Sequence, residues 1–168
     1  ASDLEAVLAK IKIPAEELVR GGGGEGELTQ RVRWELAETH GWKKHNFEIK
    51  KIVDGVEKES ISHEVDHVKV FSRGTFALEI EWNNKDPFFD RDLNNFRLLF
   101  DLRAISVGVI ITRCDHLQDI FNELGRGSSY GASTTHMSKL LPRITGGSGA
   151  GCPILVFGIS NKLYDENC

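Results

Sequence analysis

The sequence lacks the features that mark secreted, membrane-spanning or zinc-binding proteins. Its three cysteines, Cys114, Cys152 and Cys168, are odd in number, far apart and without CxxC spacing, which argues against both a disulfide framework and a zinc site. No apolar run approaches the length that crosses a membrane, and residues 1–10 do not read as a signal peptide. We therefore expect a cytoplasmic protein whose cysteines stay reduced.

Positive charge is not in excess either. Lys and Arg number 21 against 25 Asp and Glu, so the net charge is −4. This balance lowers the expectation for DNA binding, because phosphate contacts need cations. It does not exclude DNA, since metal ions neutralise acidic sites and local patches matter more than the total. The aromatic share of 8 % gives little support for a sugar-binding cleft.

What is present fits one soluble globular domain. The length of 168 residues, the apolar share of 40 % and the charged share of 27 % are ordinary for such a domain. Hydrophobic periodicity predicts an α/β (α+β) fold, a mixed central sheet flanked by helices, with residues 1–20 as an N-terminal helix and 21–168 as the core. The glycine run 21–24 predicts a linker or a loop near a ligand. The expected elements are helices at 3–20 (interrupted at Pro14), 27–41, 90–102, 115–124 and up to about 144, and strands at 47–61 (with a turn at Asp54-Gly55), around 66 and 79, at 106–112 and at 153–159.

Three carboxylates stand out on the predicted strands. Glu79 and Glu81 are two residues apart, so they point to the same face of a strand. A hairpin around Ser72-Arg73-Gly74 brings Asp66 beside them. Carboxylates gathered in this way repel one another unless a divalent cation lies between them. The pattern predicts a magnesium-dependent site that cleaves phosphodiester bonds.

A polar segment follows these carboxylates directly. Asn83 and Asn84 have side chains that bond bidentately to adenine, and Lys85 is able to donate to guanine. The segment therefore predicts a reader of base edges, coupled to cleavage through one strand. A plain Asn-Asn turn before Pro87 is the alternative interpretation.

The order of elements resembles the core of the PD-(D/E)xK nuclease superfamily. More narrowly, the stretch from Glu79 to Lys85, the Asn/Arg/Phe-rich helix after it and the run VGVIIT before Arg113 resemble the BglII/BstYI group of type II restriction endonucleases. The segment Ser133-Thr134-Thr135-His136 also resembles that group. The similarity covers roughly residues 22–159.

The resemblance implies roles for the carboxylates. Asp66 bridges the metal and the scissile phosphate, Glu79 is the second Mg²⁺ ligand, and Glu81 holds or orients the attacking water. It also suggests a helix glutamate near the metal, for which Glu27 is the candidate. An acidic first-turn residue stabilised by the helix dipole is an equally good interpretation of Glu27.

One position departs from the superfamily pattern. The usual lysine is absent after Glu79-Ile80, and Glu81 stands in its place. Lys69, Arg73 and Lys85 are then the candidates for supplying positive charge, unless metal-activated water suffices.

A second reader segment and a dimer follow from the same resemblance. Ser133, Thr134, Thr135 and His136 are candidate base readers, with Lys139 reaching phosphate; a Ser/Thr cap that starts a helix is the alternative. Arg97, Arg103 and Arg113 are either phosphate contacts or surface charges. An enzyme that cuts both strands of a palindrome acts as a two-fold dimer, so we expect a homodimer. The helix 90–102 with Phe88 and Phe89 is the candidate interface, or core.

The predicted function is that of a Mg²⁺-dependent type II restriction endonuclease acting on double-stranded DNA at a short palindrome, with a GATC centre suggested by the resemblance. The alternatives are a non-restriction nuclease of the same fold and a DNA-binding module with a decayed site.

Overall fold

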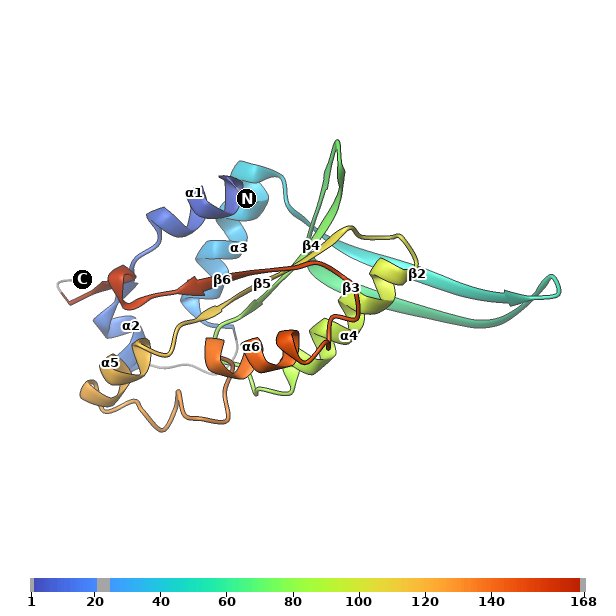
Figure 1. Cartoon of the computed structure of the whole chain (residues 1–168). Coiled ribbons are helices and arrows are strands. Elements are labelled where there is room, and N and C mark those ends of the chain that lie inside the picture. The colour runs from blue at the N-terminus through green and yellow to red at the C-terminus, as the bar shows by residue number, and fades with distance from the viewer. Residues whose placement is uncertain (1, 21–24, 167–168) are drawn as a thin grey trace.

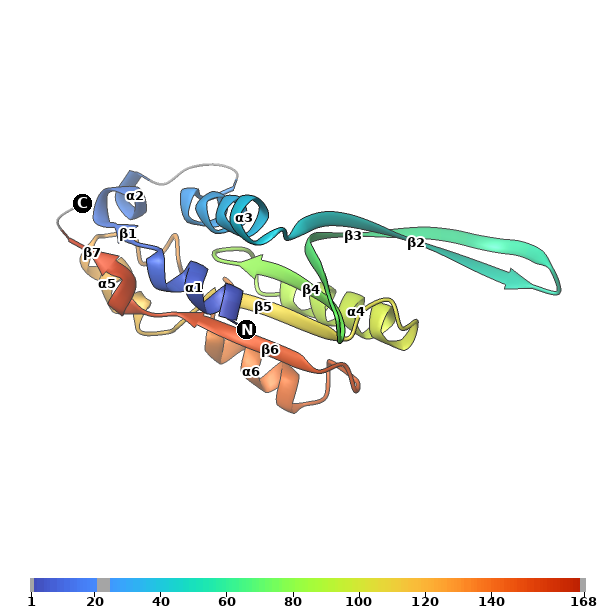
Figure 2. The same cartoon turned by 90° about the horizontal axis from the view of Figure 1, so that it is seen from above.

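A five-stranded mixed sheet forms the centre of the molecule, with helices on both faces and a long two-stranded arm at one edge (Figures 1 and 2). The computed structural model describes residues 2–20 and 25–166; the glycine run 21–24 and Cys168 lie outside the described residues. This architecture confirms the predicted α+β fold.

The strand order is β2 (Lys43–Val53), β3 (Val56–Phe71), β4 (Gly74–Glu81), β5 (Val107–Arg113) and β6 (Ile154–Ile159). Strands β2, β3 and β4 are antiparallel neighbours, whereas β4, β5 and β6 run parallel. The β-branched run of β5 lies in the interior of the sheet, as its sequence predicts. The turn at Ser72-Arg73 places β3 directly beside β4, which confirms the predicted hairpin.

Each face of the sheet carries its own apolar core. On one face, Leu78 and Ile80 of β4 pack in a cluster with residues of α1 (Ser2–Lys10), α2 (Ala15–Arg20), α3 (Glu27–His40) and α5 (Leu117–Glu123). On the other face, Ala77 and Ile110 pack against α4 (Phe88–Asp101) and α6 (Met137–Thr145). Within the described residues, no helix is both long and apolar enough to cross a membrane.

The N-terminal segment is helical and is interrupted near Pro14, as its sequence predicts. It forms two helices, and between them Ile13-Pro14 makes a short parallel pair, β1, with Tyr164-Asp165, β7, after a 3₁₀ turn at Asn161–Leu163. A pairing between such distant segments leaves no local signal. The side chains of Leu4, Val7 and Leu18 are buried in the same cluster as Leu78, so this segment packs onto the sheet.

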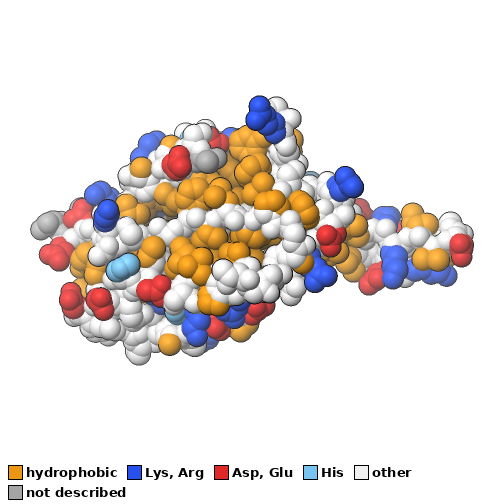
Figure 3. All heavy atoms as spheres, viewed as in Figure 1, with side chains coloured by type: hydrophobic (Ala, Val, Ile, Leu, Met, Phe, Trp, Pro, Cys, Tyr) orange, Lys and Arg blue, Asp and Glu red, His pale blue; other side chains and the backbone are white. Residues whose placement is uncertain are grey.

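The arm consists of the outer parts of β2 and β3 around the Asp54-Gly55 turn. All residues from 50 to 62 are exposed, and Ile52 is 63 % exposed. Basic, acidic and apolar side chains are mixed along it (Figure 3). At the other edge, hydrophobic side chains gather on the face around β6, between α1 and α6 (Figures 1 and 3).

Candidate active site

Glu79 and Glu81 lie on the same face of β4, as strand alternation requires. Their neighbour Ala77 belongs to the core on the α4 face, while Leu78 and Ile80 belong to the core on the opposite face. Glu79 is 9 % exposed and Glu81 is 2 % exposed. Two carboxylates are therefore buried side by side between the sheet and α4.

A third buried carboxylate, Asp92 of α4, joins them, and sequence reasoning missed it. Its side chain is fully buried. Arg91 donates from Nε to Asp92 Oδ1 over 2.8 Å, and its Nη2 lies 2.7 Å from the same oxygen and 3.4 Å from Glu81 Oε1. Its place in the helix could have revealed it. Asp92 lies on the same buried face of α4 as Phe89 and Leu93, where helical periodicity predicts an apolar residue.

The electrostatics of this cluster follow from burial. Burial raises the pKa of Glu79 to about 8, and the nearby charges of Asp92 and Asp66 add to the shift. Burial also raises the pKa of Glu81, with Asp92 as the next cause. The pKa of Asp92 is raised by burial as well. Arg91 opposes all three shifts without cancelling them. In the absence of a metal, the Glu79 carboxyl therefore holds its proton at neutral pH.

Asp66 lies at the border between this cluster and a cleft. Its side chain is about half exposed, and Lys44 Nζ lies 3.9 Å from its Oδ1. The cleft, about 800 Å³ in volume, runs between the start of α3 and the end of β4. Four predicted site residues line it: Asp66, Glu27, Asn83 and Asn84. Gln30 and Arg33 of α3, which sequence reasoning did not select, also line it. The fold thus collects these four residues from three separate segments.

Glu27 occupies the first position of α3 and faces the cleft from the side opposite β4. It pairs with Arg20 Nη1 at 3.1 Å, and about half of its side chain is exposed. The first-turn position agrees with the helix-dipole interpretation, while its place in the cleft wall agrees with the metal-ligand interpretation. Its assignment as a ligand stays a prediction.

The two predicted reader segments lie side by side, although about 50 residues separate them. Lys85 and Thr134 form an antiparallel bridge, the Thr135 amide donates to the Asn84 carbonyl over 2.8 Å, and the Asp86 amide donates to the Ser133 carbonyl over 3.0 Å. This ladder fixes both loops at the end of β4. It also connects them to the carboxylates, because Asn84 Nδ2 donates to Glu81 Oε2 over 2.7 Å.

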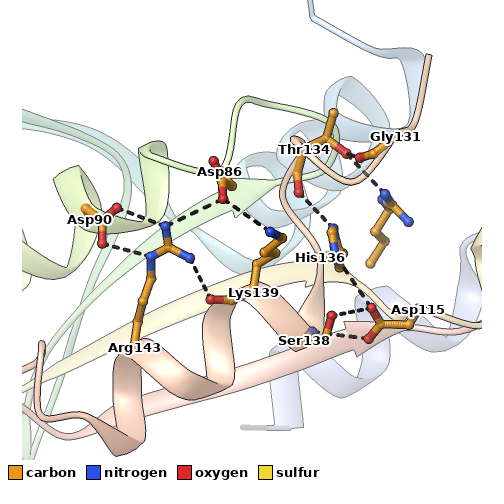
Figure 4. A network of polar contacts seen from close by, with 10 residues as sticks. Asp86, Asp90, Asp115, Gly131, Thr134, His136, Ser138, Lys139 and Arg143 are labelled. Carbon is orange, nitrogen blue, oxygen red and sulfur yellow. Dashed lines mark hydrogen bonds and ion pairs between the residues drawn. The ribbon is translucent and has the colours of Figure 1, made fainter. Parts of the chain in front are cut away.

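Within the second segment, most side chains are used internally. Thr134, Thr135 and His136 are buried. His136 Nδ1 lies 2.7 Å from the Thr134 carbonyl oxygen, and its Nε2 lies 3.7 Å from Asp115 (Figure 4). Burial lowers the pKa of His136 and Arg113 acts in the same direction, so the imidazole is neutral at neutral pH. Ser133 remains exposed to solvent.

Two cations of α6 tie this helix to the loop after Asn84. Arg143 makes a two-pronged contact with Asp90, at 2.8 and 3.0 Å, and also lies 3.7 Å from Asp86 (Figure 4). Lys139, the predicted phosphate contact, points to Asp86 with its Nζ 3.9 Å away. The loop is therefore held from the ladder on one side and from α6 on the other.

The family model for the restriction endonucleases BglII/BglIII matches residues 1–159, which is nearly the whole chain. The chain belongs to this family. No curated protein matches it. Membership in the BglII/BglIII family confirms the resemblance drawn from the sequence, and it makes the protein a nuclease of a DNA-cleaving restriction family.

Restriction endonucleases typically use a divalent metal, and the donor chemistry here fits one. Buried carboxylate oxygens are what Mg²⁺ prefers, and Oδ2 of Asp92 is buried without a hydrogen-bond partner. In the arrangement seen, however, no three His, Cys, Asp or Glu side chains among residues 2–20 and 25–166 lie close enough together to hold an ion. Mg²⁺ is commonly held by only one or two carboxylates, with waters and phosphate oxygens as its other ligands.

The three cations selected from the sequence contact other groups or solvent. Lys69 contacts Asp3 of α1 at 2.5 Å, and Arg73 occupies the exposed β3–β4 turn. Lys85 lies exposed in the ladder with Thr134. Among the described residues, Arg91 contacts Glu81 and Asp92, and Lys44 lies near Asp66. Sequence reasoning selected neither of these cations.

Proposed function

We propose that the protein is a Mg²⁺-dependent type II restriction endonuclease that hydrolyses phosphodiester bonds of double-stranded DNA at a short palindromic site. The observation that carries the proposal is the hydrogen bond between Asn84, in the polar loop, and Glu81, in the buried carboxylate cluster. It joins a group suited to reading bases to a group suited to hydrolysis within one site.

The carboxylates divide the chemistry between them. Asp66 and Glu79 would hold Mg²⁺, with Glu27 as a further ligand from the far wall of the cleft. The ion supplies charge neutralisation at the phosphate and lowers the pKa of bound water. Glu81 orients the attacking water, and the sheet keeps these groups in place, since small misplacements cost much rate.

Base reading falls to the ladder of the two loops. Asn83, Asn84 and Lys85 carry amide and ammonium groups of the kinds that read bases in the major groove. Ser133 adds an exposed hydroxyl, and Lys139 reaches phosphate. The buried side chains of Thr134, Thr135 and His136 serve recognition by holding the loop in shape.

Cutting both strands of a palindrome calls for two copies of the site related by two-fold symmetry, so the active form is a homodimer. A GATC centre is the target proposed from the family resemblance, and the cytoplasm is the proposed location.

The deciding experiment incubates the purified protein with long DNA of known sequence and Mg²⁺. Glu79→Gln is the inactive variant, and Glu48→Gln, an exposed glutamate on the arm, is the matched control. Discrete bands from the wild type and the control, lost in Glu79→Gln, support restriction cleavage, and end-mapping gives the site. A smear of DNA fragments that is absent with Glu79→Gln would indicate a non-restriction nuclease. If the folded wild-type protein binds the DNA but leaves it intact, the protein is a DNA-binding module without cleavage activity.

A further inference from the structure

The carboxylate cluster needs a positive charge close to it. The lysine that usually follows the second carboxylate in this superfamily is replaced by Glu81, which adds a negative group where a cation is expected. In their ionised form, three buried carboxylates without a counter-charge would cost several kcal/mol. Arg91 is the cation that lies against them: its Nη2 is 2.7 Å from Asp92 Oδ1 and 3.4 Å from Glu81 Oε1.

The Arg91 guanidinium is held in this position from two sides. It lies over the ring of Phe88, 4.4 Å from the centroid, one helical turn earlier on α4. Its Nε donates to Asp92 over 2.8 Å. Stacking together with a hydrogen bond to a carboxylate fixes both the plane and the direction of the group.

Glu81 is thereby held at both of its oxygens. Arg91 contacts Oε1 and Asn84 donates to Oε2. The carboxylate proposed to orient water therefore has its rotamer set by one residue of the recognition loop and one residue of α4.

We propose that Arg91 is a positioning residue of the active site, which supplies positive charge to the carboxylate cluster and fixes the orientation of the Glu81 carboxylate, with Asp92 as its anchor. The inference rests on the proposed nuclease function. An arginine suits this role better than a lysine, because its planar fork contacts two carboxylates while it stacks on an aromatic ring.

The test compares Arg91→Gln and Arg91→Lys with Lys162→Gln, which removes an exposed positive charge in the 3₁₀ turn after β6. Single-turnover cleavage of a duplex with the mapped site is measured at saturating DNA and Mg²⁺, and DNA affinity is measured with Ca²⁺ in place of Mg²⁺. We expect Arg91→Gln to lower the cleavage rate by about a hundredfold, as loss of one preorganised charge contact does, and to change affinity less than about threefold. Arg91→Lys should recover part of the rate, and Lys162→Gln should match the wild type. A rate for Arg91→Gln within about threefold of wild type, or a loss confined to affinity, would overturn the proposal.

A second measurement needs no cleavage. The titration of the Glu81 carboxyl is followed by carbon NMR in the metal-free, DNA-free protein. Its pKa should rise in Arg91→Gln and stay unchanged in Lys162→Gln. An unchanged Glu81 titration in a folded Arg91→Gln protein refutes the contact. If the wild type cuts no DNA, the nuclease proposal fails, while this measurement still decides whether Arg91 holds Glu81.

Discussion

At the scale of single residues, the buried carboxyl groups set how the stability of the metal-free protein depends on pH. Burial raises the pKa of Glu79 from its ordinary 4.5 to about 8, so between these values the folded state holds a proton that the unfolded state has released. The stabilisation is complete below about pH 4.5 and is lost as the pH rises through about 8. We expect Glu79 to lower the free energy of unfolding in urea across this window, by at most about 1.4 kcal/mol per pH unit.

Glu79→Gln should flatten this slope, because its amide does not titrate. The wild type and the variant are compared in EDTA from pH 5 to 8. Burial lowers the pKa of His67 to about 4, so this group makes the stability of both proteins rise with pH up to about 6.5. The difference in stability between the two proteins is therefore the deciding quantity, and a difference that stays constant from pH 5 to 8 would show that Glu79 is charged in the folded protein.

The two neighbouring asparagines should have different effects on cleavage. Asn84 donates to Glu81, whereas Asn83 donates to the carbonyl of Ser129 over 3.3 Å. Asn84→Ala should therefore lower the single-turnover rate by about tenfold or more, since a hydrogen bond to a charged group is worth about 1.5–3 kcal/mol. Asn83→Ala should act on DNA affinity alone. Equal rates for the two variants would contradict the link between the loop and Glu81.

Arg113 is a structural residue, neither a phosphate contact nor a surface charge. It is 1 % exposed, donates to the Tyr130 carbonyl over 2.8 Å and to Thr134 Oγ1 over 3.1 Å, and lies over the ring of Phe121. Arg113→Met leaves these acceptors unpaired, so it should lower the free energy of unfolding by about 3 kcal/mol. Chemical denaturation measures the loss, and Arg97→Met should change it by less than about 0.5 kcal/mol. A loss below 1 kcal/mol would mean that the loop does not depend on Arg113.

At the scale of elements, the distance between α4 and the sheet is set by a glycine. A Cβ at Gly108 of β5 would lie 2.5 Å from the ring of Phe96 and 2.9 Å from Ile154. Gly108→Ala should push α4 outward, lowering stability by about 1–3 kcal/mol and slowing cleavage, because α4 carries Arg91 and Asp92. Gly26→Ala is the control, since its Cβ would make an ordinary 3.6 Å contact with Trp82. Unchanged thermal unfolding of Gly108→Ala would show that the helix accommodates the methyl group.

The elements also show what the sequence could and could not predict. Alternation along β4 and the turn signals at Asp54-Gly55 and Gly74 act over a few residues, so the hairpins and the shared face of Glu79 and Glu81 were predictable. The ladder between Lys85 and Thr134 joins distant segments, and no local pattern encodes such a pairing. Asp92 was not predicted as a site residue for another reason. Helical periodicity marks its position as buried, and at a buried position the same periodicity predicts an apolar residue.

At the scale of the whole molecule, the arm contributes little to folding. Residues 50–62 are exposed, and the apolar clusters lie in the body. Replacing residues 50–60 by an Asn-Gly turn that joins Ile49 to Ile61 should change the free energy of unfolding by less than about 1 kcal/mol. Leu78→Ala, in the core, should cost about 3 kcal/mol in the same urea titration. A shortened chain that fails to fold would show that the arm is part of the core.

Strand β3 has a mechanical consequence. Its 16 residues run without a break from the arm tip to the β3–β4 turn, a length of about 50 Å at 3.3 Å per residue. Asp66 sits on this strand where it enters the body, in the wall of the cleft. A load applied at the tip is thus transmitted along one continuous backbone to that carboxylate, and anything that grips the arm also sets the position of one side of the cleft.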